Sequence, residues 1–105
     1  MSRNRRLHER FPVQLSVTIV YEGQEIPAST MNISLGGMLV CTEVRFAVGT
    51  PLTIRVQLPD LKEPSELPAF VRWVRDGQVG VQFGQLRARD TWGLNRLLRN
   101  AMPST

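Results

Sequence analysis

Apolar and polar residues alternate through the middle of this chain, and this alternation constrains its fold more than any other feature. From Val13 to Tyr21 the odd positions are apolar and most of the even positions are polar. Successive side chains of a strand point to opposite faces of a sheet, so this period of two predicts a half-buried strand. Similar alternation, or a short apolar run, predicts five further strands through 26–33, 38–42, 52–58, 69–74 and 79–83.

Gly and Pro mark the connections between these strands. Residues 22–24 (Glu-Gly-Gln) and 76–77 (Asp-Gly) predict tight turns, the second one a hairpin turn of the primed type. Pro27 lacks an N–H group, which indicates an edge position for that part of its strand. The stretch 59–68 contains three prolines among charged residues, and we expect an exposed loop or a bulged edge there.

The pattern changes to a helical period near the end of the chain. Four apolar residues recur there at i, i+3, i+4 and i+7: Leu94, Leu97, Leu98 and Ala101. This spacing predicts a short amphipathic helix over roughly 89–101, with Asp90 as its N-cap and Pro103 as the stop signal. Trp92 is expected to pack against the strands or to lie near the helix start. Strands followed by one helix predict a β-barrel or sandwich with a terminal helix.

The charge is concentrated at the N terminus. The 105 residues have room for a single core, and 13 basic against 9 acidic residues give a net charge of +4. Four of those basic residues and one acidic residue lie within 1–10, which leaves +1 for the other 95 residues. Because this basic head has few apolar side chains, we expect 1–12 to be a flexible segment and 13–102 to form the folded domain.

Several classes of protein are excluded because the chain lacks the residues that their chemistry needs. Cys41 is the only cysteine and His8 the only histidine, so neither a disulfide framework nor a zinc site of His and Cys is expected. Cys41 lies in an apolar run, which favours a buried thiol. The carboxylates are scattered and no activated nucleophile stands out, so we expect no enzymatic activity. No apolar run is long enough for a membrane span or a signal peptide, which indicates a cytoplasmic protein.

Two short motifs are candidates for ligand binding. Arg6 and Arg10 are spaced R-x-x-x-R just before the first strand. Arginine forms bidentate hydrogen bonds with phosphate and with the guanine edge, and its plane stacks on aromatic rings. A basic run at a terminus is, however, commonly a solvated tail.

The second motif follows the second predicted strand. Asn32 and Ser34 are two residues apart on an extended chain and therefore point to one face, and Gly36 and Gly37 follow them. Small polar side chains beside glycine suit the close approach of a flat polar ligand. The same pattern is commonly a turn in which side chains bond to the backbone.

Taken together, the motifs resemble those of the PilZ domain, a small bacterial receptor module for the second messenger cyclic di-GMP. Residues 6–10 match the family's R-x-x-x-R, residues 32–37 match its [D/N]-x-S-x-x-G, and 71–74 with 80–83 look like its closing hairpin. The resemblance covers roughly residues 5–100. It implies an all-β fold, a six-stranded antiparallel β-barrel with a C-terminal α-helix, which agrees with the strand count above.

The resemblance also implies a binding site for cyclic di-GMP. In it, Arg6 and Arg10 clamp the guanine edge and the phosphates. Arg5 stands just before R-x-x-x-R, where an arginine is associated in the family with an intercalated pair of ligands, so two ligands per chain are favoured. Trp73 is a candidate for stacking on a guanine, although its position in the pattern favours a core or helix-packing role. The implied ligand-binding residues are Arg5, Arg6, Arg10, Asn32, Ser34, Gly36 and Gly37.

The expected function is that of a bacterial cyclic di-GMP receptor. Its arginine head would change conformation on binding and signal to an unidentified partner protein, in motility, exopolysaccharide synthesis or surface attachment. One alternative is a PilZ-like interaction module that does not bind the nucleotide. Another is a small nucleic-acid-binding barrel, which the charge of only +1 over 11–105 disfavours. We expect no metal or cofactor and no polymeric nucleic acid, and either a monomer or a homodimer.

Overall fold

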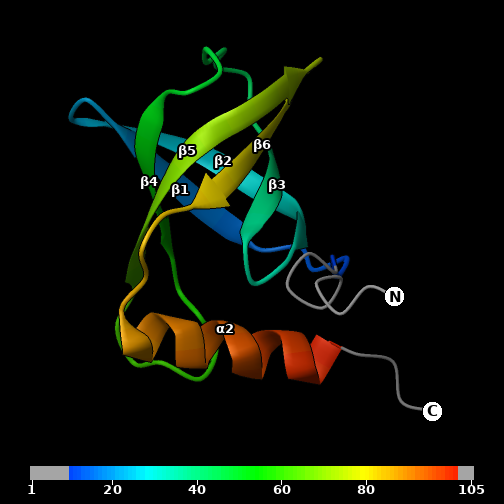
Figure 1. Ribbon diagram of the computed structural model, residues 1–105, viewed down its shortest axis with the longest axis vertical. Helices are drawn as coiled ribbons and strands as arrows, with labels where there is room; N and C mark the ends of the chain where they lie inside the picture. Colours follow the sequence, from blue (N-terminus) through cyan, green and yellow to red (C-terminus); the bar gives the residue numbers. More distant parts are fainter. Residues whose placement is uncertain (1–9, 102–105) are drawn as a thin grey trace.

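Six antiparallel strands close into a barrel within residues 10–101, the part of the chain that the computed structural model describes, and one helix lies at an end of this barrel (Figure 1). The order of strands around the barrel is β1-β2-β3-β6-β5-β4. The elements are β1 (Ser16–Tyr21), β2 (Gln24–Ile33), β3 (Gly37–Cys41), β4 (Pro51–Val56), β5 (Ser65–Arg75), β6 (Gln78–Phe83) and α2 (Ala88–Ala101). The predicted all-β barrel with a C-terminal helix is confirmed.

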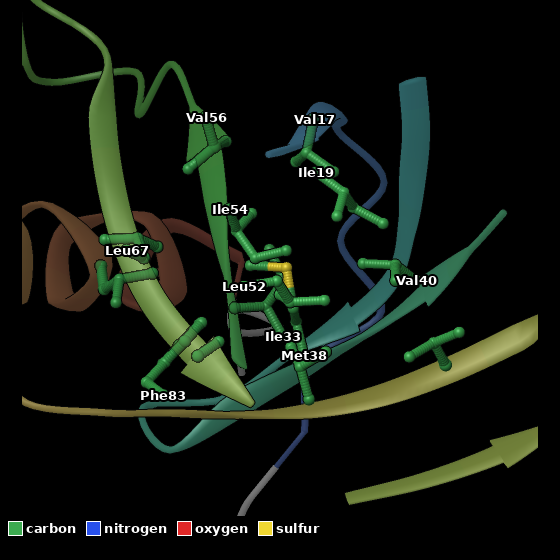
Figure 2. Close-up of a cluster of buried hydrophobic side chains, with 14 of the residues drawn as sticks. Val17, Ile19, Ile33, Met38, Val40, Leu52, Ile54, Val56, Leu67 and Phe83 are labelled. Atoms are coloured by element: carbon green, nitrogen blue, oxygen red, sulfur yellow. The ribbon is translucent and has the colours of Figure 1, made fainter. Parts of the chain in front are cut away.

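Alternating apolar side chains from the strands fill the barrel interior (Figure 2). Ile19, Ile33, Ile54 and Leu67 are completely buried. Burial of a side chain of this size contributes roughly 1.5–3 kcal/mol to folding, so these residues are a main source of stability. Cys41 is only half-buried, because it points to the opposite face of β3 from its buried neighbour Val40.

The first strand is shorter than the alternation predicts, because the Thr30 side chain takes the place of part of the backbone hydrogen bonding between the strands. The buried Thr30 hydroxyl donates to the Val13 carbonyl (2.6 Å) and accepts from the Leu15 N–H (2.8 Å). The regular strand β1 therefore begins only at Ser16. Pro27 does lie at an edge within the described chain, since β3 pairs with β2 from Ser29 onward.

The turn between β5 and β6 differs from the prediction. Gly77 has a φ of +75°, whereas Asp76 does not have a positive φ, so this turn is not the primed type I′. The connection between β1 and β2 has that signature instead, with φ of 49° at Glu22 and 79° at Gly23. The pairing of the flanking strands therefore helps to set the type of a turn, and the Asp-Gly dipeptide alone does not determine it.

The proline-rich stretch 59–68 is only partly a loop. Its last four residues belong to β5, where Ser65 pairs with Val56 and Leu67 pairs with Ile54. Ser65 and Leu67 are buried, while the residues between and after them are exposed. Of the two expectations for this stretch, the exposed loop was wrong for 65–68, because the composition of the stretch concealed this short alternation. The edge position is confirmed, since β6 pairs with β5 only from Ala69 onward, but the pairing of 65–68 with β4 contains no bulge.

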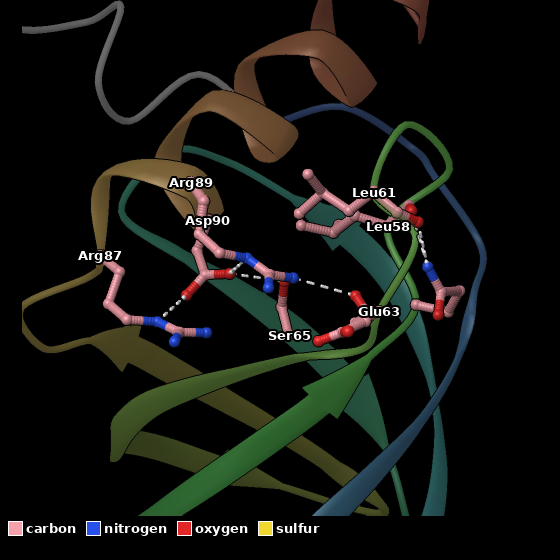
Figure 3. Close-up of polar contacts among 8 residues, drawn as sticks. Leu58, Leu61, Glu63, Ser65, Arg87, Arg89 and Asp90 are labelled. Atoms are coloured by element: carbon pink, nitrogen blue, oxygen red, sulfur yellow. Dashed lines mark hydrogen bonds and ion pairs between the residues drawn. The ribbon is translucent and has the colours of Figure 1, made fainter.

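Helix α2 is attached to the barrel by a leucine stripe and by one buried carboxylate. Asp90 is 1% exposed, and its carboxylate accepts hydrogen bonds from Ser65 Oγ (2.6 Å) and Arg87 Nε (3.2 Å), as Figure 3 shows. The Thr91 N–H donates to the Arg87 carbonyl, which makes Arg87 the N-cap. The prediction of Asp90 as N-cap was therefore wrong: it lies in the first turn, directed at β5. No helix in the described part is both long and apolar enough to cross a membrane.

Loss of the Ser65–Asp90 hydrogen bond should destabilise the fold. We expect Ser65→Ala to lower the free energy of unfolding by about 1–3 kcal/mol, because a buried carboxylate would lose its closest donor. The exposed Ser29→Ala, also in a strand, should change it by less than about 0.5 kcal/mol. Urea unfolding followed by circular dichroism measures both variants. Equal effects would show that this contact does not hold the helix.

Candidate ligand-binding site

The structure brings Arg10 and Asn32 together at the end of β2. Phe11 and Ile33 form an isolated β-bridge, in which each N–H donates to the other carbonyl at 2.9 and 3.0 Å. This bridge fixes the chain next to Arg10 along the strand end. Arg10 Nη1 then donates to Asn32 Oδ1 at 3.1 Å. The second arginine of R-x-x-x-R and the first residue of the Asn-x-Ser motif therefore form one unit, whereas Arg5 and Arg6 lie outside the described residues.

Ser34 shapes the turn between β2 and β3. Its side chain is buried, and Oγ accepts from the N–H groups of Gly36 and Gly37, both at 3.1 Å. The same hydroxyl donates to the Gly37 carbonyl at 3.3 Å. A hydroxyl has one donor and two acceptor sites, so these three hydrogen bonds occupy all of the sites of Ser34 Oγ. Ser34 therefore has the turn-stabilising role that was one of the two interpretations of this motif. Asn32, in contrast, bonds to Arg10.

Gly37 allows two strands to approach each other closely. It pairs with Gln82 of β6, and a Cβ at this position would overlap the carbonyl oxygen of Val81. The adjacent Gly36 carbonyl accepts from the Phe83 N–H at 2.8 Å. The two glycines therefore attach the motif turn to the end of the β5–β6 hairpin.

A pocket of about 370 Å³ lies where the motif turn meets this hairpin, within the usual size range of ligand sites. Among the described residues that line it, Arg10 and Arg72 carry charge and no side chain is a carboxylate. The pocket therefore suits an anion. Its lining consists of Arg10, Ser34, Gly36, Gly37, Arg72, Trp73, Gly80, Val81, Gln82 and Phe83.

Trp73 lies at this pocket and not in the core. The register of β5 against β6 shifts between Val71 and Trp73, so Arg72 is an extra residue in the ladder. Trp73 pairs with Gly80, where a Cβ would overlap the indole ring. The indole is half-buried and outside the core cluster, so the core interpretation of Trp73 was wrong. The Arg75 guanidinium carbon lies 5.9 Å from the ring centroid.

Sequence reasoning missed Arg72, Gly80 and Gln82 as pocket residues. They reach the pocket because β6 pairs with β3, and Gln82 stands opposite Gly37, 45 positions earlier in the chain. A single sequence does not show which distant strands pair. The hairpin pattern placed these residues on β5 and β6, but it did not indicate that β3 and the motif turn lie next to them.

Two larger hollows, of about 480 and 760 Å³, lie elsewhere, the first along 42–45 and the second along 41–44. The first also includes the tip of the β5–β6 hairpin, and the second includes 26–29 of β2. None of the predicted binding residues in the described chain lines either hollow. Size alone therefore does not identify the site, and the motif residues favour the smaller pocket. Residues 10–101 hold no group of three or more His, Cys, Asp or Glu side chains suited to a metal ion.

Comparison with known proteins places the chain in a family. The profile of the PilZ domain matches residues 4–100. The cellulose synthase catalytic subunit (UDP-forming) of Xanthomonas axonopodis pv. citri (strain 306) is 33% identical over 86 residues, which are 81% of this chain. The matched part is only 12% of that protein.

Two solved structures share the fold. The crystal structure of the PilZ domain of CeSA from a cellulose-synthesizing bacterium has a TM-score of 0.69 at 21% identity, covering 88% of this chain and 96% of that one. The Bacillus subtilis inhibitor of motility, MotI/DgrA, has a TM-score of 0.67 at 24% identity, covering 89% and 51%. The profile match over nearly the whole chain shows that this protein belongs to the PilZ domain family, whose members are regulatory binding modules and generally receptors of cyclic di-GMP.

Proposed function

We propose that this protein is a cyclic di-GMP receptor that holds the nucleotide in the pocket between Arg10 and the β5–β6 hairpin. The observation that carries the proposal is the 3.1 Å hydrogen bond between Arg10 and Asn32 at this pocket. Asn32 orients the guanidinium and uses one of its five N–H donors. The other donors can pair with a phosphate or with the O6/N7 edge of guanine, both of which accept two parallel hydrogen bonds.

The N-terminal arginines would complete the site. Four residues of chain span at most about 14 Å, so Arg6 is within reach of the pocket that Arg10 lines. We propose that the head is mobile in the free protein and that Arg6 and Arg10 clamp one nucleotide. Arg5 would help to hold a second, intercalated one. Closure of the head over the ligand would create a new surface, through which the receptor signals to a partner protein.

Trp73 would provide a stacking surface for a guanine base. Gly80 leaves room for the indole on β6, and the extra residue Arg72 displaces the ladder next to it. Arg75 lies over the same ring, so we expect its guanidinium to move aside or to join the stack when the base arrives. The process controlled is proposed to be exopolysaccharide synthesis, because one relative of the chain is the catalytic subunit of a cellulose synthase. Motility and surface attachment are the other expectations for the family.

Isothermal titration calorimetry tests the nucleotide site. The wild-type protein should bind cyclic di-GMP saturably below about 100 μM, with two nucleotides per chain. Because charge-assisted hydrogen bonds contribute roughly 1.5–3 kcal/mol each, Arg10→Ala should weaken binding by about ten- to a hundredfold. Arg45→Ala, at an exposed arginine outside the pocket, is the matched control and should bind as the wild type does. Absence of saturable binding by the wild type would refute the proposal.

Fluorescence tests the role of Trp73. In a Trp92→Phe background the only tryptophan is Trp73, and its emission should change as cyclic di-GMP is added. Trp73→Ala should weaken binding roughly tenfold or more, because stacking on an aromatic side chain contributes about 1–3 kcal/mol per base. Trp92→Phe alone should leave the affinity unchanged. Unaltered affinity in Trp73→Ala, or a silent Trp73 signal at saturation, would exclude stacking.

A further inference from the structure

The outward side of α2 carries an exposed tryptophan in line with two arginines. Trp92, Arg96 and Arg99 recur at i, i+4 and i+7 and therefore share one face of the helix, which we name the α2 outer face. The buried leucines Leu94, Leu97 and Leu98 occupy the opposite side of the helix. The helix itself lies across one end of the barrel (Figure 1). Trp92 is 50% exposed, so the prediction that it packs against the barrel was wrong, although it does lie near the helix start.

Two side chains of the α2 outer face, those of Trp92 and Arg96, are held in place before any partner binds. Arg96 Cζ lies 5.5 Å from the centroid of the Trp92 ring, and Arg96 Nε donates to Asp60 Oδ2 at 3.0 Å. Asp60 belongs to the loop between β4 and β5, so the loop positions the guanidinium over the indole. Arranging long side chains costs conformational entropy on binding, and this cost is reduced where they are already ordered.

The charge of this face selects the kind of partner. Helix α2 contains three arginines and one carboxylate, that of Asp90, which is buried and bonded to Ser65. The charges that the helix itself presents to solvent are therefore positive. Tryptophan and arginine are also the residues most enriched among those that dominate binding energy at protein interfaces.

We infer that the α2 outer face docks an acidic segment of a partner protein. An apolar side chain of that segment would cover the Trp92 ring, while its carboxylates pair with Arg96 and Arg99. Three residues of helix rise about 4.5 Å, so the two guanidinium groups suit carboxylates one turn apart on a partner helix.

A protein segment fits this face better than a nucleic acid or a membrane does. The net charge over residues 11–105 is only +1, so no broad basic surface surrounds the two arginines. Asp60 lies within the face at its contact with Arg96 and would repel a dense row of phosphates. Separate carboxylates on a protein can avoid Asp60 and still reach both arginines.

This inference rests on the proposed function only in that a receptor without enzymatic activity needs a partner. The α2 outer face shares no residue with the pocket at Arg10 and Trp73. Substitutions in one place should therefore leave binding at the other place intact, and the two proposals can fail separately.

An NMR titration of the full chain tests the inference, with a synthetic amphipathic helical peptide of glutamate and leucine as the probe. We expect saturable shifts of the Trp92 indole N–H and of backbone amides in 89–100, with a Kd below about 1 mM. Arg99→Glu should weaken binding at least about tenfold, and Trp92→Ala likewise. Arg45→Glu, which reverses an exposed charge away from the helix, is the matched control and should have no effect.

Parallel titrations with other ligands distinguish an acidic peptide from the alternative partners of this face. A lysine and leucine peptide of the same pattern should not shift these signals, and calorimetry with cyclic di-GMP should give the wild-type affinity in Arg99→Glu. Equal binding of both peptides, or shifts centred away from α2, would overturn the inference. So would tighter binding of phosphatidylglycerol vesicles or of an oligo-dT strand at this face. Circular dichroism of each variant verifies that the fold is retained.

Discussion

The close contact between β3 and β6 at Gly37 is the constraint on which the arrangement of this protein depends. A side chain at that position would overlap the carbonyl oxygen of Val81, so the two strands meet at this distance only through glycine. The contact closes the barrel between the first three strands and the β5–β6 hairpin. It also places the turn of the Asn-x-Ser motif beside Trp73 and Gly80 of the hairpin, which creates the pocket.

Short-range hydrogen bonds then arrange the polar groups around this contact. Ser34 holds the turn through its hydroxyl, and the Phe11–Ile33 bridge brings Arg10 to Asn32. The backbone pairing of Phe11 with Ile33 therefore positions the exposed guanidinium of Arg10. In the proposed receptor, Asn32 already orients Arg10 before cyclic di-GMP binds, which would lower the entropy cost of binding.

Local patterns in the sequence predicted most of the fold, because each strand except part of β5 shows either alternation or a short apolar run. The exceptions have tertiary causes. Residues 65–68 resemble a loop by composition but pair with β4, Asp90 binds Ser65 instead of capping its helix, and Trp92 remains exposed beside Arg96. The family resemblance implied that Arg10 and Asn32 belong to one site, and the structure places them in hydrogen-bond contact. The contribution of Arg72, Gly80 and Gln82 depends on the β3–β6 register, which no local pattern encodes.

Backbone NMR mapping of cyclic di-GMP tests the central claim most directly, because it reports where the nucleotide binds. The account predicts saturable shifts for the backbone amides of 10–11, 32–37, 72–73 and 80–83, the segments around the pocket. Shifts concentrated instead in 26–29 and 41–44, along the largest hollow, would contradict it.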